Sequence, residues 1–241
     1  MTNLVEIHDL TYKRNLHTIL TNVNLSLPKG QIIGLLGENG AGKTTLMRLI
    51  AGAAIPHQGQ IQIDGAKQVT DRKALVSFSN ALAGINDNTE LSKIAHFCQT
   101  VYPDFNTENF TKLLQLMNLQ PEQRLNALSK GNRMKFMIAI TFARQASLYL
   151  LDEPFNGIDS MARKKIVHSI IQWKPENASI IVSDHHVTDI AAILDQVVVV
   201  KDKTVVDHQS AEDIRAKQGR SIEDYYESFY QDADQGGTLD D

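Results

Sequence analysis

One octapeptide constrains the fold of this chain more than any other feature. It reads Gly37-Glu38-Asn39-Gly40-Ala41-Gly42-Lys43-Thr44 and matches the pattern G-x-x-x-x-G-K-[ST]. A nearly continuous apolar run at 31–36 precedes it, which is typical of a strand covered on both faces, and a helical pattern at 43–51 follows. A glycine-rich loop in this position predicts an α/β fold in which a buried strand leads to a phosphate-binding loop.

The residue types of the loop predict its chemistry. Glycines let the backbone curl so that successive N–H groups and the N-terminus of the helix point at one anion. The Lys43 ammonium would reach the β and γ phosphates of a nucleotide, and the Thr44 hydroxyl can ligate Mg²⁺. We therefore expect nucleotide binding by the whole octapeptide and by Thr45.

Two adjacent acids follow a second buried strand at 148–151. A parallel strand delivers its next residues to the carboxyl edge of the sheet, where ligands bind. Asp152 would hold Mg²⁺, directly or through water, and Glu153 would polarise the water that attacks the γ phosphate in line. For this segment alone, an acidic turn before Pro154 is the alternative interpretation.

The remaining patterns divide the chain into an α/β part and a helical part. Alternating apolar and polar residues at 4–8 and 23–27 predict an antiparallel opening. Helical periods dominate from 90 to 146. Short apolar runs then return with amphipathic segments between them, in βαβαβ order, which predicts a doubly wound parallel sheet. The runs lie at 148–151, 179–182 and 197–200, and the amphipathic segments lie around 166–173 and 187–194.

Composition excludes several classes of protein. Lysine and arginine together number 24 and the acids 28, so the formal charge is 24 − 28 = −4, and no nucleic-acid partner is expected. One cysteine excludes an internal disulfide and a cysteine zinc cluster. The chain has no signal-peptide pattern and no run of about 18 apolar residues, so we expect a cytoplasmic protein without a membrane span.

Several motifs, taken in order, resemble the ATPase subunit of an ATP-binding cassette (ABC) transporter over roughly the first 200 residues. The segment Leu128-Ser129-Lys130-Gly131-Asn132 stands where that family has its signature Leu-Ser-Gly-Gly-Gln. Asp159 ends a segment similar to the family's D-loop, and Ser183-Asp184-His185 is similar to its switch-histidine segment. Lys130 resembles a variation found in exporter ATPases for drugs and peptides, and Asn132 departs from the family pattern.

The resemblance implies a P-loop NTPase fold in one ABC ATPase domain, 1–241. Its ATP-binding core would be a doubly wound, mainly parallel sheet with an antiparallel β subdomain at the N-terminus, formed by about 1–89 and 147–205. An inserted α-helical subdomain carrying the signature would occupy about 90–146. A C-terminal extension of one or two helices with an acidic tail would occupy about 206–241.

In the family, the signature of one subunit contacts the ATP of its partner, which assigns that role to Ser129, Lys130, Gly131 and Asn132. The residues alone allow two interpretations of Ser129. It opens an apolar helix at 133–143 and could form a second anion-binding helix N-terminus. It could equally be a plain N-cap.

Three further assignments depend on the resemblance. His185 would hydrogen-bond the γ phosphate and take part in catalysis. Asn80 occupies the expected place of the family's Q-loop glutamine and would contact Mg²⁺ or its water through its amide. Tyr12 and Arg14 compete to stack on adenine.

The sequence thus predicts an enzyme that binds ATP with Mg²⁺ and hydrolyses it. Two copies would close head to tail on two nucleotides and drive a separate integral membrane permease, of exporter type, on the cytoplasmic face of the cell membrane. Two alternatives stay open. One is a soluble ABC ATPase of translation or DNA repair, and the other is a regulatory nucleotide-binding subunit with little turnover.

Overall fold

A computed structural model describes residues 2–80, 82–184 and 187–231, and within them the main sheet has six strands. Their order is β5-β6-β7-β3-β8-β9, in which neighbouring strands are parallel except that β9 runs antiparallel to β8. The strands are β3 (Ile32–Leu36), β5 (Val76–Phe78), β6 (Leu148–Asp152), β7 (Ser179–Asp184), β8 (Gln196–Lys201) and β9 (Thr204–Ser210). The predicted doubly wound, mainly parallel sheet is confirmed.

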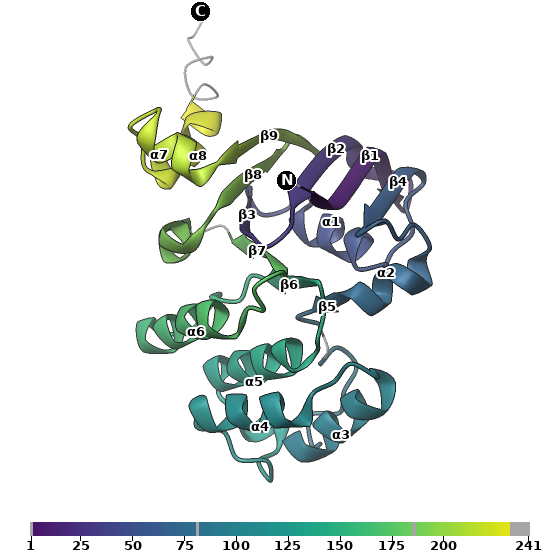
Figure 1. Ribbon diagram of the computed structural model, residues 1–241, viewed down its shortest axis with the longest axis vertical. Helices are drawn as coiled ribbons and strands as arrows, with labels where there is room; N and C mark the ends of the chain where they lie inside the picture. Colours follow the sequence, from purple (N-terminus) through teal and green to yellow (C-terminus); the bar gives the residue numbers. More distant parts are fainter. Residues whose placement is uncertain (1, 81, 185–186, 232–241) are drawn as a thin grey trace, which may run out of the picture.

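A second, antiparallel sheet lies on the other side of α1 (Lys43–Ile50) from the main sheet, and all three share one hydrophobic core (Figure 1). It has the order β2-β1-β4, with β1 (Asn3–Arg14), β2 (His17–Pro28) and β4 (Gln58–Ile63). The antiparallel opening predicted from the alternating residues is therefore present, and its first two strands are longer than the alternation indicates.

The central strands are buried on both faces because successive side chains enter two different hydrophobic cores. On β8, Val198 and Val200 pack into the core shared with α1 and the antiparallel sheet, whereas Val197 and Val199 pack into the core shared with the helices. All four are completely buried. A near-continuous run of valines is what this placement requires.

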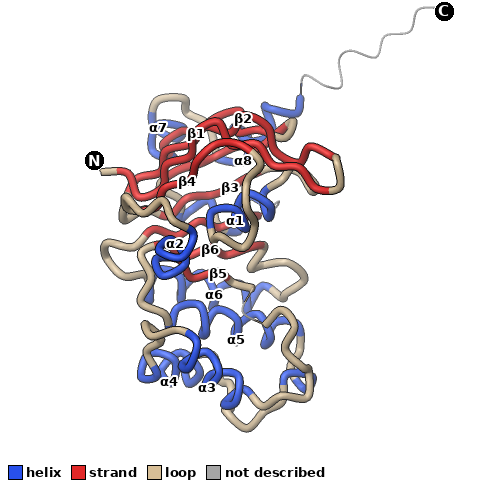
Figure 2. The backbone as a smooth tube through the Cα atoms, turned by 90° about the vertical axis from the view of Figure 1, so that its right-hand side faces the viewer, coloured by secondary structure: helices blue, strands red, loops and turns tan. Residues whose placement is uncertain are grey.

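The predicted helical insertion lies at the opposite end of the molecule from the antiparallel sheet (Figure 2). It consists of α3 (Leu91–Val101), α4 (Thr107–Leu116), the 3₁₀ turn η1 (Leu125–Ala127) and α5 (Lys130–Ala143). Buried Arg144 joins this subdomain to the core. Its guanidinium pairs with Asp104 at 3.1 Å, stacks over the Tyr102 ring and donates to the Val76 carbonyl of β5 at 2.5 Å.

Three segments differ from the sequence expectation. The segment 187–194 is not an amphipathic α-helix but two 3₁₀ turns, η2 (Val187–Asp189) and η3 (Ala191–Ile193), whose backbone hydrogen bonds join residues three apart, as from the Ile193 N–H to the Ile190 carbonyl. An unpredicted helix, α2 (Val69–Leu75), precedes β5, so the strand expected over 74–78 is shorter. Buried Arg72 explains α2, since it donates to the Leu49 and Ile50 carbonyls at the end of α1.

The C-terminal part adds more to the core than expected. β9 continues the main sheet to Ser210, beyond the boundary near 205, and α7 (Ala211–Ala216) and α8 (Ile222–Gln231) follow. Lys201 fastens α8 by donating to the Phe229 carbonyl at 2.6 Å. Within the described ranges, the chain forms no helix of the length and hydrophobicity that crossing a membrane would require.

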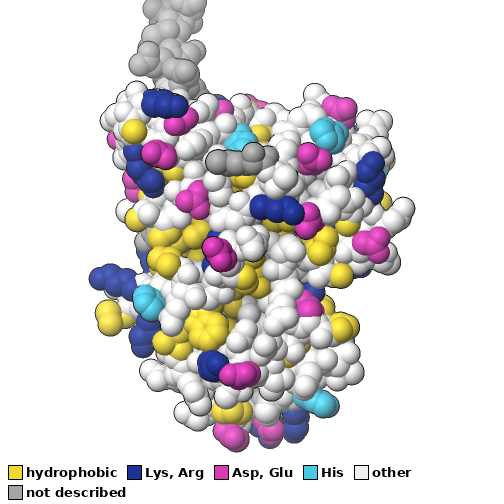
Figure 3. Space-filling view, viewed as in Figure 1, with side chains coloured by type: hydrophobic (Ala, Val, Ile, Leu, Met, Phe, Trp, Pro, Cys, Tyr) yellow, Lys and Arg dark blue, Asp and Glu magenta, His cyan; other side chains and the backbone are white. Residues whose placement is uncertain are grey.

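One face of the molecule carries hydrophobic side chains across its middle, between the C-terminal helices and the helical insertion (Figure 3). The helix α6 (Ser160–Trp173), which follows β6, has two exposed apolar side chains, Met161 and Ile171. The acidic tail predicted at the end of the C-terminal extension lies almost entirely outside the described residues.

Candidate nucleotide-binding site

The glycine-rich octapeptide connects β3 to α1, as predicted. Two of its glycines are required by close packing. A Cβ at Gly37 would lie 2.4 Å from the Val200 carbonyl oxygen, and a Cβ at Gly42 would lie 2.7 Å from the Leu20 side chain. Gly42 also has a φ of +112° and provides no side-chain cap, so the first N–H groups of α1 are left for a ligand.

Lys43 is the buried cation of the loop, with only 4 % of its surface exposed. Its ammonium donates to the Gly37 carbonyl at 2.5 Å and to the Glu38 carbonyl at 2.9 Å. Burial lowers the pKa of Lys43, and the neighbouring carboxylates, Glu153 and Asp152 first among them, partly offset this effect. The loop thus holds a positive charge that an incoming phosphate would compensate.

Asp152 lies at the carboxyl end of β6, beside the loop. The Thr44 hydroxyl donates to Asp152 Oδ1 at 3.1 Å, which brings together two of the predicted metal ligands. A hydroxyl and a carboxylate are the oxygen donors that Mg²⁺ prefers, and Mg²⁺ usually takes its remaining ligands from water and substrate phosphates. These residues therefore fit the ion.

Glu153 follows Asp152 in a left-handed conformation, with a φ of +46°. Its N–H donates to the hydroxyl and to the carbonyl of Ser183, both at 3.1 Å. Its carboxylate accepts from the Asn156 side-chain amide at 3.1 Å. The backbone and the side chain of the predicted general base are thus both held, and strained backbone of this kind is frequent at active sites.

Two serines to which the sequence interpretation gave no role of their own contact Asp152. Ser183 of β7 donates to Asp152 Oδ1 at 2.6 Å, and the Ser79 hydroxyl accepts from the Asp152 N–H at 3.0 Å. These serines stand at or just beyond the carboxyl ends of β7 and β5, which flank β6. The signal that could have identified them is a polar residue at the end of an apolar strand.

The signature segment begins α5, at the predicted place. Ser129 is the N-cap of this helix, and its hydroxyl accepts from the Asn132 N–H at 3.2 Å. The Asn132 side-chain oxygen accepts from Lys135, one turn further along α5, at 3.1 Å. Within one chain, Ser129 therefore has the capping role that we gave as the alternative interpretation.

The signature also contacts the loop that precedes α6. The Lys130 side chain lies over Gly157, so closely that a Cβ at Gly157 would overlap its ammonium. Asp159, the predicted D-loop residue, is exposed two residues later, where its carbonyl accepts the Arg163 N–H in the first turn of α6. The structure thus places the signature and the predicted D-loop side by side.

The structure also locates the remaining candidates. Asn80 is exposed directly after Ser79. Tyr12 is partly buried and meets the His57 ring edge-on, with 5.7 Å between the ring centroids, whereas Arg14 is exposed near the tip of the β1–β2 hairpin. His185 lies outside the described residues. The role of each of these residues stays a prediction.

Known proteins are similar to this chain in sequence. The ABC transporter family matches residues 20–156. The ABC-type transporter ATP-binding protein EcsA of Bacillus subtilis is 33 % identical over 196 residues, which are 76 % of this chain and 77 % of that protein. The intermembrane phospholipid transport system ATP-binding protein MlaF of Haemophilus influenzae is 30 % identical over 239 residues, with 90 % and 87 % covered.

Solved structures agree in fold. A structure described as the ATP-binding subunit of an ABC transporter has a TM-score of 0.83 at 24 % identity and covers 94 % of this chain and 99 % of its own. CbiO1 from Clostridium perfringens, part of the transporter complex CbiONQ, has a TM-score of 0.74 at 19 % identity and covers 90 % and 92 %. The predicted P-loop NTPase fold and the predicted resemblance are confirmed, and the chain belongs to the ABC transporter family as an ATP-binding ATPase subunit.

Proposed function

We propose that two copies of this chain close head to tail on two molecules of Mg·ATP, and that closing and reopening drive a separate membrane permease. The observation that carries the proposal is the convergence of Lys43, Thr44 and two acids at one edge of the main sheet. One of these acids, Asp152, has a hydrogen bond to the loop, and the other, Glu153, is held in an unusual backbone conformation.

Each residue of this set has a distinct task. The Lys43 ammonium exchanges its bonds with the loop carbonyls for bonds with the β and γ phosphates. Thr44 and Asp152 would hold Mg²⁺, which when bound neutralises charge on the phosphate oxygens. Glu153 accepts the proton of the attacking water, and Asn156 keeps the Glu153 carboxylate oriented.

The second half of each ATP site would come from the partner copy. Ser129 and Lys130 are exposed at the start of α5, and the outer part of the phosphate loop, Glu38 to Gly40, is exposed on the core. A partner in head-to-tail orientation would set its own α5 N-terminus against the bound γ phosphate. Ser129 would then exchange its bond with the Asn132 N–H for one with the phosphate.

The permease would dock on a groove of about 510 Å³ beside α5. The groove is lined by apolar Leu82, Ile85, Leu125, Met134 and Met137, and the Arg133–Asp87 ion pair lies at the same place. Residues 82–87 follow Asn80, and Arg133 follows the signature, so both walls are continuous with segments that would sense the nucleotide. A short helix of a membrane protein is a suitable occupant of such a groove.

We further propose an exporter-type permease and a place on the cytoplasmic face of the membrane. Lys130 in the signature supports the exporter direction through its resemblance to drug and peptide exporters. MlaF, a relative of this chain, is named for intermembrane phospholipid transport. The transported compound has to be found through the permease.

A capture experiment tests the function. Tagged Glu153→Gln protein with Mg·ATP is used to pull proteins from detergent-solubilised native membranes, and the partners are identified by mass spectrometry. The same variant carrying Lys43→Ala is the control, since it should not close on ATP. We expect one multi-span protein in stoichiometric amount that is reduced in the control.

The outcomes separate the possibilities. Recovery of ribosomes or DNA-repair proteins without a membrane protein would refute the transport proposal. Equal recovery of the permease by both variants would refute the expectation that permease binding requires ATP-dependent closure of two copies. Once the permease is known, substrate flux in vesicles of defined orientation measures the direction of transport. Movement of the substrate toward the membrane face that carries the ATPase subunits would refute the exporter assignment.

A further inference from the structure

Ser183, near the end of β7, lies between the two acids of the candidate site. β6 and β7 are parallel, and Ser183 is the register partner of Asp152. Its side chain is completely buried, at 0 % exposure. The hydroxyl donates to Asp152 Oδ1 at 2.6 Å and accepts from the Glu153 N–H at 3.1 Å. A single hydroxyl group therefore contacts both residues.

We propose that Ser183 is a positioning residue for ATP hydrolysis, whose hydroxyl holds the Asp152 carboxylate and the Glu153 backbone in a defined relative position. The inference rests on the roles proposed above for the two acids and concerns what keeps them in place. Ser183 is not assigned any contact with the substrate.

The contribution to Asp152 is separate from that of Thr44. Both hydroxyls donate to the same oxygen, Oδ1, at 2.6 Å from Ser183 and 3.1 Å from Thr44. Thr44 is exposed on the loop that the nucleotide would contact, so a bound ligand would break the hydrogen bond from its hydroxyl to Asp152. Ser183 belongs to a buried strand and remains as the donor that keeps the Asp152 side chain in one rotamer.

The contribution to Glu153 acts through the backbone. Its φ of +46° is unfavourable for a residue with a side chain, and other contacts must maintain it. The Glu153 N–H donates to both oxygens of Ser183. Because this backbone conformation sets the direction of the Cα–Cβ bond, the serine also determines where the Glu153 carboxylate points.

A second serine on the same strand provides a matched control. Ser179 precedes Ser183 by four residues on β7, so the two side chains lie on the same face of the strand. Ser179 is equally buried, at 1 % exposure, and its hydroxyl donates to the Pro28 carbonyl at 3.0 Å. Loss of this hydroxyl removes a buried hydrogen bond of the strand without touching the acids.

The test compares Ser183→Ala, Ser183→Thr and Ser179→Ala with the wild type. The steady-state ATPase assay separates kcat from KM. Fluorescence of a mant-ATP probe, measured with and without Mg²⁺ in the Glu153→Gln background, reports the gain in affinity that Mg²⁺ provides without turnover. Circular dichroism and thermal melting check that each variant folds.

For Ser183→Ala we expect kcat to fall about 10- to 100-fold, the range for loss of a hydrogen bond to a charged group. The KM for ATP should rise by no more than the factor by which the affinity for mant-ATP in Mg²⁺ falls. The gain in mant-ATP affinity from Mg²⁺ should shrink as well. Ser183→Thr keeps the hydroxyl and should recover most of kcat. Ser179→Ala should match the wild type in all three readouts.

Equal kinetics in Ser183→Ala and Ser179→Ala would overturn the inference, as would failure of threonine to restore kcat in a folded variant. If the alanine variant does not fold, Ser183→Cys, which keeps the volume and weakens the hydrogen bond, should show a smaller loss of kcat, and wild-type kinetics there would also overturn it. Absence of Mg·ATP hydrolysis by the wild type would instead refute the proposed function itself.

Discussion

Two helix N-termini of this molecule, those of α1 and α5, begin in opposite ways. α1 follows Gly42, which has a positive φ and provides no side-chain cap. α5 follows Ser129, whose hydroxyl accepts the Asn132 N–H. A buried ammonium, Lys43, stands at the first terminus, whereas the second is exposed to solvent.

Under the proposal that two chains share each ATP site, the difference indicates which part of the site one chain would supply. An uncapped N-terminus beside a buried cation leaves N–H donors that a phosphate can satisfy, so we expect α1 to bind a phosphate within a single chain. A capped N-terminus already has part of its donors satisfied and is stable alone. We therefore expect α5 to join an ATP site only when a partner copy brings the nucleotide to it.

The largest effect should come from Glu153→Gln, which tests whether the chemistry belongs to the α1 side. Loss of the proton acceptor should lower kcat by about 10² to 10⁴ while ATP binding persists. Steady-state ATPase assays and ATP titrations measure the two quantities. Glu122→Gln, at an exposed position in the helical insertion, is the control. Unchanged turnover in Glu153→Gln would remove Glu153 from the mechanism.

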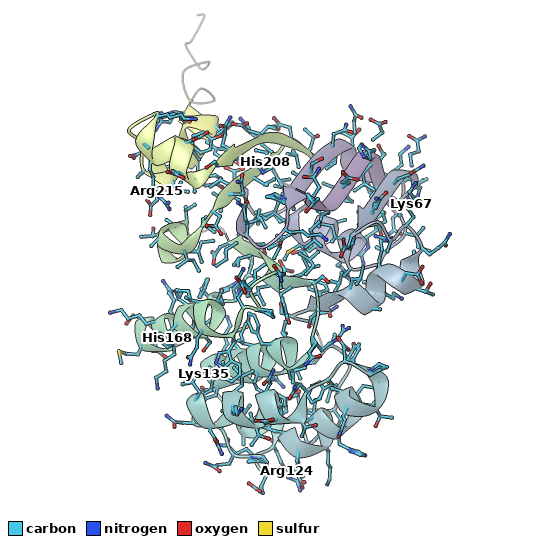
Figure 4. All side chains as sticks on the ribbon, viewed as in Figure 1. Lys67, Arg124, Lys135, His168, His208 and Arg215 are labelled. Atoms are coloured by element: carbon cyan, nitrogen blue, oxygen red, sulfur yellow. The ribbon has the colours of Figure 1, made fainter. Side chains whose placement is uncertain are left out.

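Lys43→Ala should have the next largest effect, because the buried ammonium is the main cation at the α1 terminus. We expect the dissociation constant for ATP to rise about 10- to 100-fold, since charge-assisted hydrogen bonds to phosphate are lost. Isothermal titration calorimetry measures this, with exposed Lys67→Ala as the control (Figure 4). An unaltered constant would show that the loop does not bind the phosphates through Lys43.

The core and the helical insertion also differ in the titratable groups that they bury. The core buries a charge, Lys43, whereas α3 of the insertion buries a neutral thiol, Cys98. Burial raises the pKa of Cys98 from 9.0 to about 11, so the native state keeps a proton that the unfolded chain loses. Its contribution to stability is complete below pH 9.0 and is lost as the pH rises to about 11.

Denaturant unfolding of the wild type and Cys98→Ala between pH 9.0 and about 11 tests whether stability falls with rising pH. The difference between their free energies of unfolding should change, to the disadvantage of the wild type, by up to ~2 kcal/mol. Parallel curves for the two proteins would show that burial does not hold the thiol neutral.

The smallest effect on stability should come from the α5 cap. Ser129→Ala and Asn106→Ala each remove an N-cap hydrogen bond in the insertion, from α5 and α4, and each should lower the free energy of unfolding by about 1 kcal/mol. Only Ser129→Ala should also weaken ATP-dependent dimerisation, by roughly tenfold, in analytical ultracentrifugation of the Glu153→Gln protein. Equal dimerisation by both variants would leave Ser129 as a cap alone.

The sequence was most informative where neighbours in the chain make the structure. The strand, glycine-rich loop and helix around Lys43 are contiguous, and so are β6 and its two acids. Motif and hydrophobic pattern therefore predicted both the phosphate loop and the pair of acids. The same local patterns failed at 187–194, which forms 3₁₀ turns instead of an α-helix. They also missed α2, because buried Arg72 is satisfied by carbonyls of α1, more than twenty residues away in the chain.

The sequence by itself thus determined the family, the parallel sheet and the residues able to bind phosphate and metal. Only the tertiary structure decided that Ser183 stands opposite Asp152, that Ser79 accepts its N–H and that Lys130 lies over Gly157. The physical reason is that parallel strands are joined by long crossovers. Their register therefore depends on how the helices pack, and no local pattern encodes which side chains meet across the sheet.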